Sequence, residues 1–197
     1  MTNKEEFIQI FNKKIIPKIP EARELLSFIE STDFFSAPAS VCNHSAEPGG
    51  LCFHSLNVYD AYLELLSAEY DTIEFLKYSE AQLSLVALCH DLCKINCYSQ
   101  ETRNVKVDGQ WTEKLVYTYK NKFCMGHGAK SIYLIQKFIP DFPDELLQAI
   151  YYHMGGMDNP NDGKDVSSVY AQNPYALFLH LADMIATFAR EKRPDEK

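Results

Sequence analysis

Apolar residues recur three or four positions apart along most of this chain, which is the spacing of an amphipathic helix. The pattern predicts two short helices before residue 30, a long helix over 51–69, and a nearly all-apolar helix over 81–95. Helical spacing then returns in three later segments, which are 127–138, 144–153 and 174–190. We therefore expect a mostly helical protein in which the 81–95 helix lies near the centre.

The segment 98–122 departs from this pattern, because apolar and polar residues alternate in it. The alternation runs over 105–107 and again over 115–119, and Asp108-Gly109 lies between the two runs. This dipeptide is typical of a tight turn between antiparallel strands. The pattern predicts an inserted β-hairpin whose aromatic side chains either pack across the strands or form a platform or lid for a ligand.

Two segments without clear periodicity are expected to be loops. Pro38, Pro48 and several serines lie in 34–48, and glycine, asparagine and aspartate are frequent over 155–165. Loops carry many of the contacts that select a ligand, so we expect substrate specificity to depend on these loops and on the hairpin.

The composition is that of an ordinary globular protein, with 46% hydrophobic and 23% charged residues in a chain of 197. At this length we expect a single domain, with its core over about 37–189 and a solvated tail over 190–197. The formal net charge is −8, which argues against long nucleic acid or an anionic membrane as a partner.

Neither a secretion signal nor a membrane span is expected from the sequence. Residues 1–14 mix lysine and glutamate without an apolar core, and the apolar stretch 175–189 is too short and contains His180 and Asp183. We therefore expect a cytoplasmic protein whose six cysteines are thiols rather than disulfides.

Histidine and aspartate residues occur on several of the predicted helices. The six that stand out are His54, His90, Asp91, His127, His153 and Asp183. Imidazole and carboxylate together suit Mn, Fe, Zn, Ni or Co, and a helical bundle can direct such side chains to one point. His90 and Asp91 would lie about 100° apart around a helix, so both could flank one ion.

The order His, His-Asp, His, His, Asp resembles the HD-domain superfamily of metal-dependent phosphohydrolases. The signature His90-Asp91-Leu92-Cys93-Lys94 looks like the family's His-Asp-x-x-Lys, and the resemblance covers 37–189. The residues ahead of His54 look like the HD domain of 3'-to-5' exoribonucleases, and those around His127 and His153 resemble small stand-alone HD hydrolases. The resemblance implies an all-α HD-domain bundle that carries the small β-hairpin as an insertion.

The resemblance also implies two divalent transition-metal ions that share Asp91. One ion would be held by His54, His90, Asp91 and Asp183, and the other by Asp91, His127 and His153. Two ions lower the pKa of a shared water, so the bridging hydroxide could attack a phosphate ester of a nucleotide or similar small molecule. Asp91 and Lys94 would be the catalytic residues, with the Lys94 ammonium stabilising the phosphoryl group.

Two further residues are candidates for binding the substrate. His44, in the loop before the long helix, is expected to contact the substrate or to protonate the leaving group. Ser131, one helical turn after His127, is expected to donate a hydrogen bond to a phosphate oxygen.

Alternatives to a hydrolase remain open from the sequence. Some HD-fold enzymes use the same ligand pattern with two irons to activate oxygen, and a non-catalytic binding module could retain the fold. The sequence leaves open the substrate, the choice between monoester and diester, the metal and the oligomeric state.

The cysteines suggest a competing site. Segments 42–44 and 52–54 both read Cys-x-His, but this spacing is tighter than that of ordinary structural zinc sites. Three other cysteines recur at helical spacing and are expected to pack in the core, namely Cys89, Cys93 and Cys97.

Overall fold

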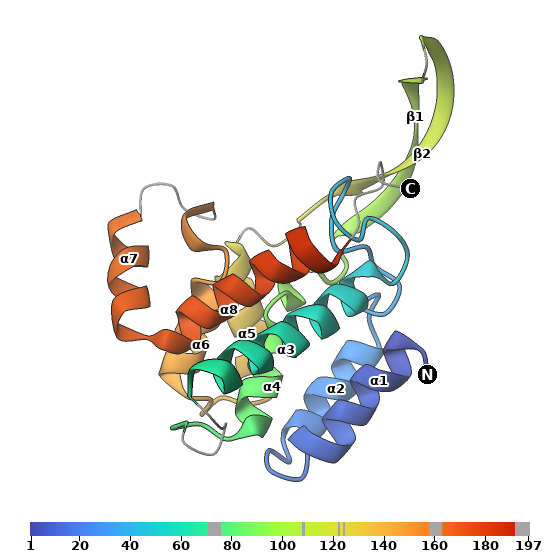
Figure 1. Cartoon of the computed structure of the whole chain (residues 1–197). Coiled ribbons are helices and arrows are strands. Elements are labelled where there is room, and N and C mark those ends of the chain that lie inside the picture. The colour runs from blue at the N-terminus through green and yellow to red at the C-terminus, as the bar shows by residue number, and fades with distance from the viewer. Residues whose placement is uncertain (71–75, 108, 122, 124, 158–162, 192–197) are drawn as a thin grey trace.

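A computed structural model describes residues 1–70, 76–107, 109–121, 123, 125–157 and 163–191. The helices that it describes are α1 (Asn3–Ile10), α2 (Ala22–Glu30), α3 (Gly50–Glu69), α4 (Glu80–Cys89), α5 (His127–Gln136), α6 (Asp144–Tyr151), α7 (Gly163–Gln172) and α8 (Pro174–Ile185). Short helical turns lie at η1 (Phe11–Ile15), η3 (Leu92–Lys94), η4 (Gly155–Met157) and η6 (Ala186–Arg190). The mostly helical fold is therefore confirmed (Figure 1).

The helix α4 forms the centre of the bundle, as its nearly all-apolar sequence predicts. Its residues from Leu83 to Cys89 are fully buried. Ser79 caps its first turn, because the hydroxyl accepts a hydrogen bond from the Gln82 N–H and the Gln82 side chain accepts one from the Ser79 N–H. The buried helix delivers the next two residues, His90 and Asp91, into the interior of the protein.

The predicted helix over 81–95 ends earlier than expected. Helical dihedrals end at His90, and Asp91 adopts φ −106° and ψ 20° before the turn η3 begins. The estimate of 100° between His90 and Asp91 on one helix is therefore wrong. After the break, the Lys94 ammonium lies 2.6 Å from the Asp91 carboxylate.

The N-terminal helices cover one side of the bundle with aromatic side chains. The Phe7 ring centroid lies 5.0 Å from those of both Phe11 and Phe34, and all three residues are fully buried. Contacts of this kind stabilise a core beyond simple area burial. The helix α3 packs against α1 on this side and against α4 and α8 on the other.

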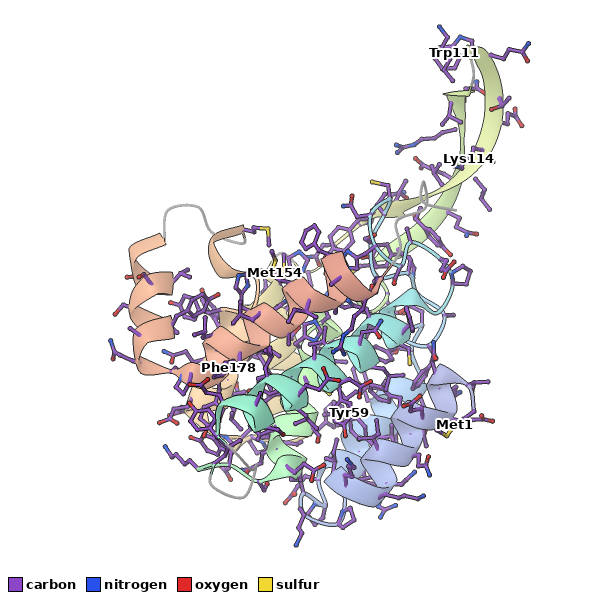
Figure 2. The ribbon with its side chains drawn as sticks, in the orientation of Figure 1. Met1, Tyr59, Trp111, Lys114, Met154 and Phe178 are labelled. Carbon is purple, nitrogen blue, oxygen red and sulfur yellow. The ribbon has the colours of Figure 1, made fainter. Side chains whose placement is uncertain are left out.

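The strands β1 (Tyr98–Val107) and β2 (Gln110–Tyr119) form the predicted antiparallel hairpin, with Tyr98 paired to Tyr119. The hairpin extends from the helical body as an arm (Figure 1). At its base, Tyr98 packs against Tyr119 with ring centroids 5.4 Å apart, which confirms cross-strand packing. Trp111 is 71% exposed and lies near the far end of the arm, beyond the helical body (Figure 2). Of the predicted turn, Asp108 lies outside the described residues.

The C-terminal part differs from the sequence-based prediction in two places. The segment expected to be a loop over 155–165 contains η4, and the helix α7 begins at Gly163. In α7, Val166, Val169 and Tyr170 follow helical spacing, but this apolar group is short and comes directly after glycine, asparagine and aspartate residues that indicated a loop. The solvated tail expected over 190–197 is also wrong for Glu191, which is buried, and residues 192–197 lie outside the described residues.

One expectation about membranes can be compared with the fold. Among the residues that the structure describes, no helix combines the length and the apolar character needed to cross a membrane.

Candidate metal centre

The six predicted metal ligands converge in the interior. They come from five parts of the chain, with His54 on α3, His90 and Asp91 after α4, His127 at the start of α5, His153 after α6 and Asp183 on α8. Their donor atoms fall into overlapping groups within 4.8 Å, namely His54-His90-Asp91, His90-His153-Asp183 and Asp91-Cys93-His127. These groups could hold a metal ion.

Asp91 lies at the centre of this arrangement, because its two carboxylate oxygens face different imidazoles. Oδ2 lies 3.6 Å from His54 Nε2 and 3.5 Å from His90 Nε2. Oδ1 lies 3.7 Å from His153 Nε2. Two ligands bonded to one ion at about 2.0–2.2 Å are themselves roughly 3–3.6 Å apart. The two Oδ2 distances therefore match shared coordination better than direct hydrogen bonds, and the Oδ1 distance lies just above this range.

Backbone carbonyls fix the Nδ1 atoms of His90 and His153. His90 Nδ1 lies 2.7 Å from Ala87 O, and His153 Nδ1 lies 2.6 Å from Ile150 O. Because Nδ1 must donate in these bonds, Nε2 carries the lone pair and points inward. Both Nε2 atoms are buried and lack a hydrogen-bond partner. A bound cation would satisfy them, so the donor set fits a metal ion.

His54 is held by a carboxylate that the sequence analysis missed. Its Nδ1 lies 2.8 Å from Glu191 Oε1, while the Ser45 hydroxyl donates to Glu191 Oε2 at 2.5 Å and Asn57 Nδ2 donates to Oε1 at 3.3 Å. A carboxylate on the far nitrogen of a ligating histidine orients the ring and strengthens it as a ligand. Glu191 lies in a charged C-terminal stretch, where composition gives no sign of burial.

The carboxylates and the cationic groups of the centre stabilise each other's charges. Burial would raise the pKa of Asp91, but Lys94 and His90 outweigh it and hold that pKa well below its usual value. Burial would also raise the pKa of Asp183, but the contact with His54 outweighs it and lowers that pKa. Burial would lower the pKa of His54, but the carboxylates of Asp183 and Glu191 raise it to about 10. Groups that stabilise an imidazolium in this way also stabilise a bound cation.

Lys94 lies directly beside the Asp91 carboxylate. Its ammonium is 2.6 Å from Asp91 Oδ2, and its side chain is 11% exposed. Burial would lower the pKa of Lys94, but the Asp91 carboxylate raises it, so the amine stays charged. Lys94 therefore provides a fixed positive charge beside the candidate ligands.

A cavity of about 330 Å³ leads from the surface to Asp91. One part of its lining is polar and comprises Asn43, His44, Asp91, Lys94 and Asp183. The remainder is mainly apolar and comprises Met154, Met157, Met184, Thr187 and Phe188. The lining thus combines charged and polar groups with flexible apolar side chains.

His44 lies in this cavity, as the sequence analysis expected for a substrate contact. Its ring centroid is 4.9 Å from that of His54, and its Nε2 is buried without a hydrogen-bond partner. Burial, together with the charges of His54 and Lys94, lowers the pKa of His44 to about 4. The imidazole is therefore neutral at pH 7, which favours a hydrogen-bonding role over that of a general acid.

Ser131 does not lie where a substrate contact requires. It is fully buried, and its hydroxyl accepts a hydrogen bond from the Cys93 N–H at 3.0 Å. The expectation that Ser131 binds phosphate is corrected accordingly, because helix α5 packs this side chain against the turn η3. Ser131 instead fixes the turn that carries Cys93 and Lys94.

The competing Cys-x-His zinc site is not assembled among the described residues. Cys42 is exposed and Cys52 is buried, and neither belongs to a group of potential ligands in the part of the chain that the structure describes. His54, which that site would need, lies with His90 and Asp91.

Comparisons with protein-family models, with curated proteins and with solved structures found no match to this chain. The resemblance to the HD-domain superfamily therefore rests on the ligand order and on the His90-Asp91-x-x-Lys94 signature. The convergence of the buried histidines and aspartates is independent of that resemblance.

Proposed function

We propose that this protein is a metal-dependent phosphohydrolase that cleaves a small-molecule phosphate ester at a dinuclear metal centre. The observation that carries the proposal is the position of Asp91, whose Oδ2 faces His54 and His90 while its Oδ1 faces His153. A carboxylate that presents its two oxygens to two sets of ligands is suited to bridging two ions.

We assign the ligands to two sets that share Asp91, as the resemblance implies. His54, His90 and Asp183 would join it in holding one ion, and His127 and His153 would join it in holding the other. When bound, two such ions supply a water of lowered pKa and positive charge for phosphoryl oxygens. Glu191 and the carbonyls of Ala87 and Ile150 would keep the imidazoles in the tautomer that ligation needs.

The cavity would bind and orient the substrate. Lys94 would attract the phosphoryl group by its fixed charge and stabilise the charge that develops there. Neutral His44 and Asn43 would donate hydrogen bonds to the substrate, and the methionines with Phe188 would pack against an apolar portion of it. An anionic ester with an apolar or aromatic group fits this division.

The test is hydrolysis by metal-free protein that has been reloaded with Mn, Fe, Co, Ni or Zn. The substrates are an aryl phosphate monoester and an aryl phosphate diester, each assayed with and without oxygen. We expect oxygen-independent hydrolysis that is lost in Asp91→Asn and retained in Asp165→Asn, which changes an exposed aspartate on α7.

Two results would overturn the proposal. If Asp91→Asn hydrolyses the substrate at the wild-type rate, the mechanism does not need a bridging carboxylate at this position. A requirement for both iron and oxygen, with oxygen consumed and no phosphate released, would replace the hydrolase by an oxygenase at the same ligands.

A further inference from the structure

Cys93 lies beside candidate metal ligands rather than in the hydrophobic core that its helical spacing suggested. Its side chain is buried, with 1% of the residue exposed. Its Sγ lies 3.3 Å from His127 Nδ1 and 3.7 Å from Asp91 Oδ1. Cys93 therefore lies between two of the residues assigned above to the second ion.

The neighbouring cysteines have different surroundings. Cys89 is fully buried on α4 within the hydrophobic core. The Cys97 thiol donates to the backbone carbonyls of Cys93 and Ile95 at 3.3 and 3.4 Å, and its sulfur accepts a hydrogen bond from Lys130 Nζ at 3.0 Å. Among these three cysteines, only Cys93 is in a group of potential metal ligands within the described residues.

The local structure holds Cys93 in this position. The Ser131 hydroxyl accepts a hydrogen bond from the Cys93 N–H, and Ser131 lies one helical turn after His127 on α5. Helix α5 therefore carries the candidate ligand His127 and, through Ser131, also fixes the backbone of the turn η3 that contains Cys93. This arrangement explains why Ser131 is buried here instead of lining the cavity.

The distances agree with coordination to a common ion. A metal–sulfur bond of about 2.3 Å and a metal–nitrogen bond of about 2.0–2.1 Å, at a tetrahedral angle, place the two ligand atoms roughly 3.6 Å apart. A carboxylate oxygen at about 2.1 Å gives a similar separation from sulfur. The observed 3.3 Å and 3.7 Å lie on either side of this value.

We propose that Cys93 Sγ is a ligand of the second metal ion, together with Asp91, His127 and His153. This inference rests on the dinuclear centre of the proposed function and adds a sulfur donor to it. On binding, a sulfur–metal bond replaces the S–H bond, and the thiol proton leaves to the solvent.

The two ions would then have different ligand chemistry. The ion held by His54, His90, Asp91 and Asp183 has only nitrogen and oxygen donors, whereas the other ion also has sulfur. Thiolate favours Zn, Fe and Co over harder ions such as Mg and Mn. The second position is expected to select a thiophilic metal and to bind it more tightly.

The experiment is a titration of the metal-free full-length chain with cobalt(II), followed by absorption spectroscopy and by elemental analysis of bound cobalt. Sulfur bound to cobalt(II) gives an intense charge-transfer absorption in the near ultraviolet. We expect this band in the wild type, its loss in both Cys93→Ala and Cys93→Ser, and its retention in the matched controls Cys97→Ala and Cys42→Ala. Circular dichroism of each variant establishes that it is folded.

The outcomes separate this inference from the proposed function. Two bound cobalt ions in the wild type without the sulfur band would overturn ligation by Cys93 and leave the dinuclear centre intact. A band that persists in folded Cys93→Ala would overturn it as well, because another thiol would be the ligand. No bound cobalt would overturn both proposals. If both Cys93 variants fail to fold, a wild-type spectrum without the sulfur band still overturns ligation by Cys93, and loss of the band in Cys97→Ala or Cys42→Ala would overturn it by assigning the band to another thiol.

Discussion

Nδ1 of His54 lies 2.8 Å from Oε1 of Glu191, a residue 137 positions later in the chain. His54 is on α3, and Glu191 directly follows the turn η6 that extends α8. The contact therefore depends on the packing of α8 and η6 against α3. It links the end of the described chain to the centre of the site.

Replacing Glu191 is expected to weaken metal binding without changing a direct ligand. Glu191→Gln keeps the shape of the side chain but removes the negative charge that orients His54 and strengthens it as a ligand. Changes of this kind reduce metal affinity by about 10- to 100-fold. The measurement is competition with a chromophoric chelator.

The control for this prediction is Glu24→Gln, which changes an exposed residue in the first turn of α2. Equal metal affinity in Glu191→Gln and in the wild type would show that the contact with His54 does not tune the centre.

Lys94→Ala is expected to keep the metal and lose catalytic rate. The ammonium lies beside Asp91 Oδ2 and is charged, so it can stabilise the phosphoryl group in the transition state. Removing one such group costs roughly 100- to 1000-fold in kcat. Metal content and kcat are measured on the same preparation. Lys77→Ala, at a lysine whose side chain is 62% exposed, is the control. Metal loss in parallel with rate would assign Lys94 to the integrity of the centre instead.

Gly128 is expected to control the spacing of the helices that carry His127 and His153. A Cβ at this position would lie 2.5 Å from both Cα and O of Tyr151, so Gly128→Ala must push α5 away from α6. Overpacking of this kind costs about 1–3 kcal/mol of unfolding free energy. We expect urea unfolding to show this loss, and calorimetry to show that the second ion binds more weakly than it does in the wild type while the first ion is less affected.

Gly156→Ala is the matched comparison for that variant, since a Cβ there would meet nothing within 4 Å. Unchanged stability and metal binding in Gly128→Ala would mean that the two helices can separate without cost to the site.

The apolar wall of the cavity is expected to affect substrate affinity more than turnover. Met184→Ala removes a partly exposed apolar side chain from the lining of the cavity. Loss of this apolar contact should raise KM by up to about tenfold and leave kcat nearly unchanged, because the reacting phosphate is held elsewhere. Steady-state kinetics with an aryl ester tests this. A fall in kcat with constant KM would instead indicate a role in the transition state.

Much of the fold was predictable because local patterns determine it. The nearly all-apolar run before His90 indicated the central helix, and Gly109 between alternating segments indicated the hairpin. Histidines and aspartates on separate helices also indicated a shared site, and the structure brings all six together.

The remaining features depend on contacts between distant segments. Glu191 is buried only because η6 lies against α3, and Ser131 is withdrawn from the cavity only because α5 packs on η3. Cys93 fits the spacing of a core helix, yet the helix ends at Cys89, and the turn after it places the thiol beside His127. Residue spacing alone carries no information about such breaks.

The central claim is that two ions share Asp91. Elemental mass spectrometry tests it most directly, on wild type and Asp91→Asn purified without chelator and without an affinity-metal column. The predicted result is two transition-metal ions per wild-type chain and the loss of both in folded Asp91→Asn. Zero ions in the wild type, or one ion that Asp91→Asn retains, would contradict a bridged dinuclear centre.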